Sequence, residues 1–159
     1  MSTTAIGAEC AARLKNRVCE LDLVVKMLTE IETLIRFQAP ELLYVFTRLS
    51  QSGKYRQFVF IDEGCRLLGE GKSIETAFEE AAERQPDALS LKKEDMGELQ
   101  SFFASLGKSD VEGQIKICEM HKSLLAENRA AAVVQSEKKG RLYHMMGVFG
   151  GLALAVFLI

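Results

Sequence analysis

The stretch VCELDLVVKMLTEIETLIRF, residues 18–37, decides the fold because its apolar residues recur at helical spacing along two stripes. One stripe consists of Val18, Leu21, Val25, Leu28 and Ile35. The stripe beside it consists of Val24, Met27, Ile31 and Leu34. A helix with one apolar stripe needs one packing partner, whereas two neighbouring stripes need partners on two sides. This stretch therefore predicts a helix that packs inside a bundle and ends near Phe37, shortly before Pro40.

The rest of the chain has the same helical periodicity, only two prolines, and no sustained alternation of the kind that predicts a strand. Glycines and capping residues divide it into five further helices, which begin near Pro40, Phe58, Ser73, Lys92 and Ser109. For the last of these we expect a capping box, in which the Ser109 hydroxyl accepts from the Glu112 amide. The sequence thus predicts an all-α fold: a six-helix bundle with two helical hairpins and a long last helix that runs into the C-terminal tail.

The tail, GRLYHMMGVFGGLALAVFLI, has no fixed charge after Arg141. A helix over residues 142–159 would be roughly 27 Å long, close to the thickness of the hydrocarbon core of a bilayer. We therefore predict a C-terminal transmembrane helix at 142–159, the alternative being a buried core or oligomer-interface helix. Gly147 and Gly151 have GxxxG spacing, with Gly150 beside them, and predict a contact with another membrane helix. The alternative is that glycine is simply common in membrane helices.

Basic residues flank both ends of the predicted bundle. They are Arg13, Lys15 and Arg17 at the start, and Lys138, Lys139 and Arg141 before the tail. Because positive charge gathers on the cytoplasmic side of membrane helices, these flanks place the bundle, residues 14–138, in the cytoplasm.

Composition and motifs disfavour several classes of function. Twenty basic against twenty-two acidic residues leave a net charge of −2, so no basic footprint for nucleic acid is present. Cys10, Cys19, Cys65 and Cys118 lack metal-ligand spacing and predict reduced, mostly packed thiols. His121 and His144 have no nucleophile or metal partner in the pattern. We therefore expect no enzymatic activity, no metal site and no cofactor.

Two charged groups are candidates for a docking surface. Glu79, Glu80 and Glu83 form an acidic run in FEEAAE, and Lys108 and Asp110 lie in the turn before the last helix. Such runs are most often solvated helix faces, and the docking role is the alternative that we carry forward.

Three stretches resemble the stage III sporulation protein AB family: EIETLIRF at 30–37, LGKSDVEGQIK at 106–116, and the tail at 140–159. That family is similar to the cytoplasmic domain of the type II secretion platform protein F, a compact six-helix bundle. The family usually begins with an apolar membrane helix, from which the start MSTTAIGAEC departs. The resemblance therefore implies that residues 1–13 are the remnant of such a helix, either because the true start lies upstream or because the sequence is truncated.

The resemblance implies a non-enzymatic membrane component of the channel between mother cell and forespore. Its bundle would face the mother-cell cytoplasm from the membrane that surrounds the forespore, in contact with membrane lipid. The implied partners are a secretion-type ATPase of the same locus, for which the protein would act as a docking platform, and other membrane subunits of the channel. The alternative function is a membrane-anchored helical adaptor or sensor unrelated to secretion.

Overall fold

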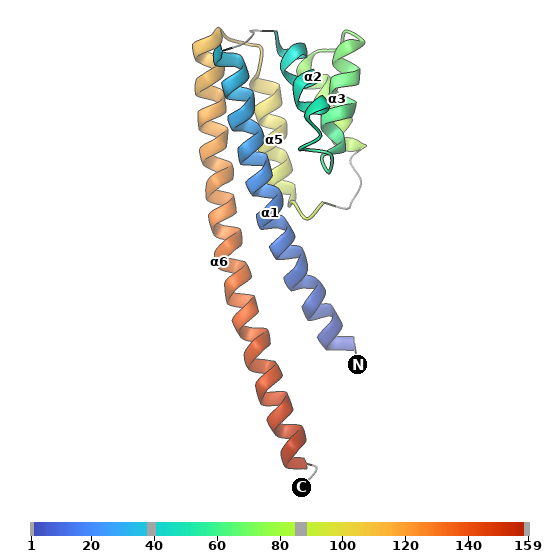
Figure 1. Cartoon of the computed structure of the whole chain (residues 1–159), viewed down its shortest axis with the longest axis vertical. Helices are drawn as coiled ribbons and strands as arrows, with labels where there is room; N and C mark the ends of the chain where they lie inside the picture. The colour runs from blue at the N-terminus through green and yellow to red at the C-terminus, as the bar shows by residue number, and fades with distance from the viewer. Residues whose placement is uncertain (1, 38–40, 85–88, 158–159) are drawn as a thin grey trace.

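The computed structural model is a bundle of six helices (Figure 1). It describes the backbone of residues 2–37, 41–84 and 89–157, and the side chains of residues 9–37, 41–84 and 89–138. The helices are α1 (Ser2–Phe37), α2 (Leu42–Ser52), α3 (Val59–Gly69), α4 (Ile74–Glu83), α5 (Lys93–Ser105) and α6 (Val111–Phe157). No strand occurs in this part of the chain, so the prediction of an all-α fold with six helices is confirmed.

Two long helices, α1 and α6, form an antiparallel pair that is the backbone of the molecule (Figure 1). Helix α5 lies beside this pair, α2 to α4 gather at one end, and both chain ends lie at the other. Ion pairs join the two long helices: Asp22 with Arg129 at 3.1 Å, Glu32 with Lys122 at 2.7 Å, and Arg36 with Glu119 at 3.7 Å. Along α1 the residue numbers of these pairs rise, while those of their partners on α6 fall. These contacts therefore specify the antiparallel direction.

Both apolar stripes of residues 18–37 contribute to the core, as predicted. Leu21 and Leu28 of the first stripe and Val24 and Met27 of the second are fully buried. Helix α1 packs against α6 and also against α2, which accounts for the need for two apolar sides. Its largest interface is with α6, so the first and last helices of the chain hold each other.

Aromatic rings join the shorter helices to one another. Phe46 of α2, Phe60 of α3, Phe78 of α4 and Phe103 of α5 are all buried. The rings of Phe78 and Phe103 are stacked, with centroids 3.9 Å apart and planes 9° apart. This cluster makes α2 to α5 one packed unit against the long pair.

Local signals in the sequence place several helix ends correctly. Gly53 ends α2 in a left-handed conformation with a φ of 67°, and the Ser73 hydroxyl accepts from the Thr76 amide at the start of α4. The capping box expected at Ser109 is wrong. Helix α6 begins one residue later, and the Asp110 carboxylate accepts from the Gly113 amide at 2.9 Å. A carboxylate is favoured there because it also faces the positive end of the helix dipole.

Replacing Asp110 with alanine should lower the free energy of unfolding by about 1 kcal/mol, the usual loss when an N-cap side chain is removed. Urea unfolding of the full chain in mild detergent, followed by circular dichroism, would measure it. Ser109→Ala is the matched control and should change stability by less than about 0.5 kcal/mol. A larger loss from Ser109→Ala than from Asp110→Ala would contradict the assigned cap.

Within the residues that the structure describes, no helix is both long and apolar enough to cross a membrane. The transmembrane helix predicted at 142–159, with Gly147, Gly150 and Gly151, lies outside the residues whose side chains are described, and so do residues 1–8 of the predicted remnant. These parts of the sequence prediction therefore stay predictions.

Candidate functional site

A buried ion pair joins three helices near the start of α5. The Arg17 guanidinium of α1 donates to both carboxylate oxygens of Asp95 on α5, at 2.7 and 2.9 Å. Arg17 is 5% exposed and Asp95 is fully buried. Asp95 also accepts from the Lys92 amide at 2.9 Å and from the Asn128 side chain of α6 at 3.1 Å. The hydrogen bonds to Asp95 are the main cause that raises the pKa of Arg17 above its usual value.

A second contact of α1 holds the segment that leads into α5. The Glu20 carboxylate accepts from the Ser90 amide at 2.8 Å, and Glu20 is almost wholly buried. Burial raises the pKa of Glu20, and the hydrogen bond from the Ser90 amide opposes part of that rise. Together, Arg17 and Glu20 fix where α5 begins relative to α1.

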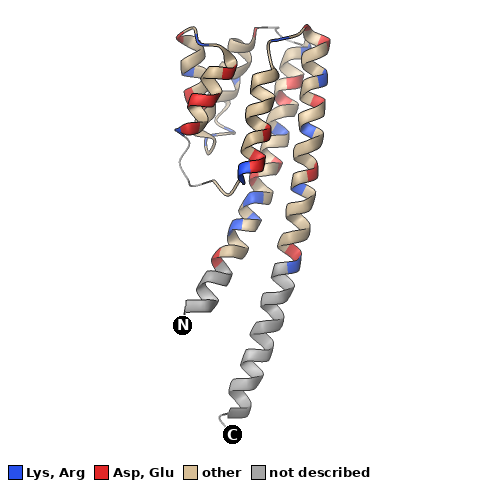
Figure 2. Ribbon diagram, turned by 180° about the vertical axis from the view of Figure 1, so that it is seen from behind, with Lys and Arg blue, Asp and Glu red and all other residues tan. Residues whose placement is uncertain are grey.

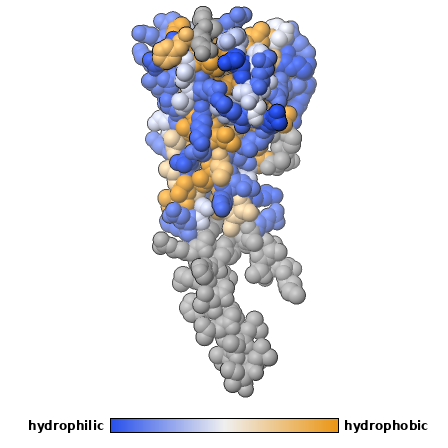
Figure 3. Space-filling model, viewed as in Figure 1, coloured by the Kyte–Doolittle hydropathy of each residue, from blue (hydrophilic) through white to orange (hydrophobic). Residues whose placement is uncertain are grey.

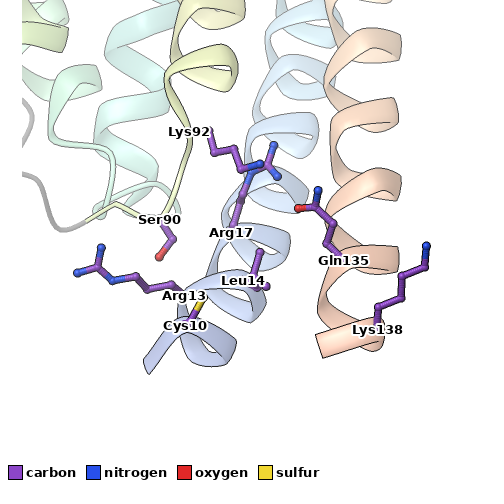
Figure 4. A pocket seen from close by; sticks show the side chains of 8 residues that line it. All are labelled: Cys10, Arg13, Leu14, Arg17, Ser90, Lys92, Gln135 and Lys138. Carbon is purple, nitrogen blue, oxygen red and sulfur yellow. The ribbon is translucent and has the colours of Figure 1, made fainter. Parts of the chain in front are cut away.

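The two basic flanks of the sequence come together beside this ion pair. A cleft of about 550 Å³ lies between α1, the segment before α5, and α6 (Figure 4). Its charged lining residues are Arg13, Arg17, Lys92 and Lys138. Figure 2 shows basic residues concentrated on α1, close to the N-terminal end of the part of that helix whose side chains are described. Lys15 is exposed on α1 but does not line the cleft, and the side chains of Lys139 and Arg141 lie outside those described.

Some of the candidate docking residues are exposed, whereas others make contacts within the molecule. Glu79 and Glu83 are exposed, and neither makes an ion pair with another described side chain. Glu75 lies one turn before Glu79 on the same side of α4, so the three carboxylates form one stripe, here called the α4 acidic face. Glu75 pairs with Lys108 at 2.8 Å across to the turn before α6. The structure thus brings Glu79 and Lys108 onto one surface through a residue that sequence reasoning had missed.

Glu80 and Asp110, the other two docking candidates, are engaged within the molecule. Glu80 is half-buried and pairs with Lys72 at 2.6 Å, while Asp110 caps α6. A shallow hollow of about 210 Å³ lies between α4 and α5, beside Glu75 and Glu79. The surface available to a partner is therefore the α4 acidic face with its neighbouring hollow, and Glu80 contributes to holding α4 instead.

Comparison of the chain with models of known protein families identifies its family. The model of the stage III sporulation protein AB family matches residues 1–159, the whole chain. This chain belongs to that family. The assignment confirms the resemblance in the sequence and gives the protein a role in stage III of sporulation. Comparisons with curated proteins and with solved structures found no match.

The stage III sporulation protein AB chain has two histidines, and His121 is the one whose side chain is described. It is a packed core residue. It is 4% exposed, its Nδ1 atom lies 2.6 Å from the Glu98 carboxylate, and its ring and that of Phe102 are edge-to-face with centroids 5.6 Å apart. His144 lies outside the described side chains. Among the described residues no group of three or more His, Cys, Asp or Glu side chains could hold a metal ion.

The four cysteines of the chain carry no disulfide and differ in accessibility. Cys118 is fully buried, and burial is the main cause that raises its pKa to about 12. Cys10 and Cys65 are half-buried and Cys19 is exposed on α1, so the thiols are mostly packed, as expected, and Cys19 is the exception. The thiolate is the reactive form, so the two positions should differ sharply in reactivity.

We expect a maleimide to label Cys19 at least about 100-fold faster than Cys118 in the folded chain at pH 7.5. Two variants, each retaining one of these cysteines with serine at the other three positions, would separate the rates by mass spectrometry. Unfolding in urea is the control and should make the two rates similar. Equal rates in the folded chain would show that Cys118 is not buried.

Proposed function

We propose that this protein is a non-enzymatic, membrane-anchored platform of the stage III sporulation machinery, which docks a secretion-type ATPase on its cytoplasmic bundle. The observation that carries the proposal is the α4 acidic face, held rigidly by the aromatic cluster and exposed together with Lys108. Membership of the stage III sporulation protein AB family supports the setting in the channel between mother cell and forespore.

The platform is anchored, in this proposal, by residues 142–159, with the bundle in the mother-cell cytoplasm. Support comes from the uncharged run at 145–159 and from the basic residues before it. In Figure 3, hydrophobic residues gather on the lower part of the described surface, towards the two chain ends. Gly147, Gly150 and Gly151 would meet the helix of another membrane subunit of the channel.

The docking surface lies far from this anchor. Lys108 precedes the first residue of α6, and Lys138 is 27 residues along that helix from Val111, a distance of roughly 40 Å. A partner on the α4 acidic face would therefore stand clear of lipid headgroups, as a soluble ATPase requires. Charge complementarity predicts a basic surface on that ATPase.

The test is capture of the cognate ATPase by the full chain in detergent. Glu79→Arg combined with Glu83→Arg should weaken binding at least about tenfold, because like charges would then face each other. The matched control combines Glu127→Arg with Glu137→Arg, the same charge change at exposed positions of α6, and should bind as the unaltered chain does. Equal binding by all three proteins, or none by the unaltered chain, would count against docking at this face.

A further inference from the structure

Positive charge lines the cleft beside the Arg17–Asp95 pair. Among the residues whose side chains are described, four basic residues line it and no aspartate or glutamate does. They are Arg13, Arg17, Lys92 and Lys138. The nearest buried carboxylates are already neutralised or bonded, because Asp95 is held by Arg17 and Glu20 accepts from the Ser90 amide. The cleft therefore has an excess of positive charge.

Three of the four cations are available to a ligand. Arg17 is buried and bonded to Asp95, so it contributes to the wall of the cleft. Lys92 and Lys138 are exposed and make no ion pair with another described side chain. Arg13 is exposed, and its one ion pair with a described side chain is a 3.4 Å contact with the exposed Glu9 one turn away, which contributes little because water screens it. An anionic ligand would compete with little inside the protein for these charges.

The uncharged lining suits a ligand that is both polar and apolar. In Figure 4, Leu14 lies on the side of α1 that faces α6, and Cys10 lies one turn before it. The Arg13 side chain extends outward on one side of them and the Lys138 side chain on the other. Ser90 and Gln135 add side chains that can donate hydrogen bonds. A rim of cations and donors around an apolar centre matches the chemistry of a phosphate group attached to a hydrocarbon.

The position of the cleft selects between sources of such a ligand. Lys138 lies four residues before the proposed membrane segment, or roughly 6 Å along the helix. At that height the cleft would meet the headgroup layer of the cytoplasmic leaflet, where anionic phospholipids are attracted by basic residues.

We propose that this cleft is a binding site for the phosphate headgroup of an anionic phospholipid such as phosphatidylglycerol. The inference rests on the proposed membrane anchoring. It adds a specific site to what would otherwise be general attraction of basic flanks to a charged surface. A bound lipid would contact α1, the segment before α5, and α6 at once, and so would hold the bundle at a defined height and angle over the membrane.

The experiment uses the full chain, purified in mild detergent with equal amounts of phosphatidylglycerol and phosphatidylcholine, and measures retained lipid by mass spectrometry. We expect phosphatidylglycerol to be retained in preference by about tenfold or more. The variant Arg13→Gln/Lys92→Gln/Lys138→Gln should lose this preference. The matched control Lys15→Gln/Lys93→Gln/Lys116→Gln removes the same charge at exposed positions outside the cleft lining and should keep it.

Three results would overturn the site. The first is no preference for phosphatidylglycerol in the unaltered chain, and the second is an equal loss of that preference in both triple variants. The third is displacement of the lipid by glycerol 3-phosphate at the same concentration as the lipid, which would identify a soluble phosphate as the ligand. Flotation of the unaltered chain with pure phosphatidylcholine vesicles separates this proposal from the anchoring on which it rests. If the chain floats with the vesicles but retains no lipid in preference, the lipid site in the cleft is wrong and the membrane anchor stands. If the chain does not float, the proposed membrane anchor is wrong as well.

Discussion

Replacing Asp95 with alanine is expected to lower the free energy of unfolding by about 3–5 kcal/mol, enough to leave a marginally stable bundle largely unfolded. The reason is the Arg17 guanidinium, which is only 5% exposed and would keep its charge while losing its partner. The Lys92 amide and the Asn128 side chain would lose their acceptor in the same change. Urea unfolding of the full chain in detergent would measure the loss.

Two further variants show whether the loss comes from the unpaired charge. Glu94→Ala, at the neighbouring exposed position on α5, should change stability by less than about 0.5 kcal/mol. Arg17→Met combined with Asp95→Leu removes both charges and keeps their volume, and should recover most of the stability. If the double variant were as unstable as Asp95→Ala, the hydrogen bonds to α5 and α6 would be the main contribution, and not the buried charge of Arg17.

Local spacing was sufficient to predict much of the fold. The two stripes in residues 18–37 depend only on the helical repeat, and so do the caps at Gly53 and Ser73, because each involves neighbours within one or two turns. The error at Ser109 is also local. Serine and aspartate are adjacent there and both are good N-caps, and a shift of one residue decides between them.

The candidate sites could not be predicted in the same way. Arg17 and Asp95 are 78 positions apart, and nothing near either residue signals that its charge is buried. Arg17 was indistinguishable from Arg13 and Lys15 as a basic flank, although only Arg17 is buried. The cleft likewise depends on the pairing of the first and last helices, which places Arg13 and Lys138 at the same height. Such long-range pairing is a property of the packed bundle and not of local periodicity.

Removing the Phe78 ring should have an effect as large as that of Asp95→Ala, because Phe78 lies where α3, α4 and α5 meet. Its ring stacks on Phe103 and also contacts Phe46, with centroids 3.9 and 4.6 Å away. Phe78→Ala should lower the free energy of unfolding by about 3–5 kcal/mol, through lost burial and the cavity left behind. If an ATPase docks at the α4 acidic face as proposed, the variant should also weaken its capture, since α4 would lose its main anchor to the bundle.

Gly64 of α3 makes this prediction specific to the contact. A methyl group added at Gly64 would come within 2.6 Å of the Phe78 ring, so Gly64→Ala alone should cost about 1–3 kcal/mol. In the Phe78→Ala background the same methyl group enters the vacated space and should be neutral or stabilising, a coupling of about 1–3 kcal/mol in a double-mutant cycle. Gly97→Ala on α5 is the control, because apart from the adjoining residues and backbone of its own helix nothing lies within 4 Å of the added methyl group, and it should stabilise the helix by about 0.5–1 kcal/mol. Additive losses from Gly64→Ala and Phe78→Ala would mean that the two residues are not in contact, and that α4 is held to the bundle elsewhere.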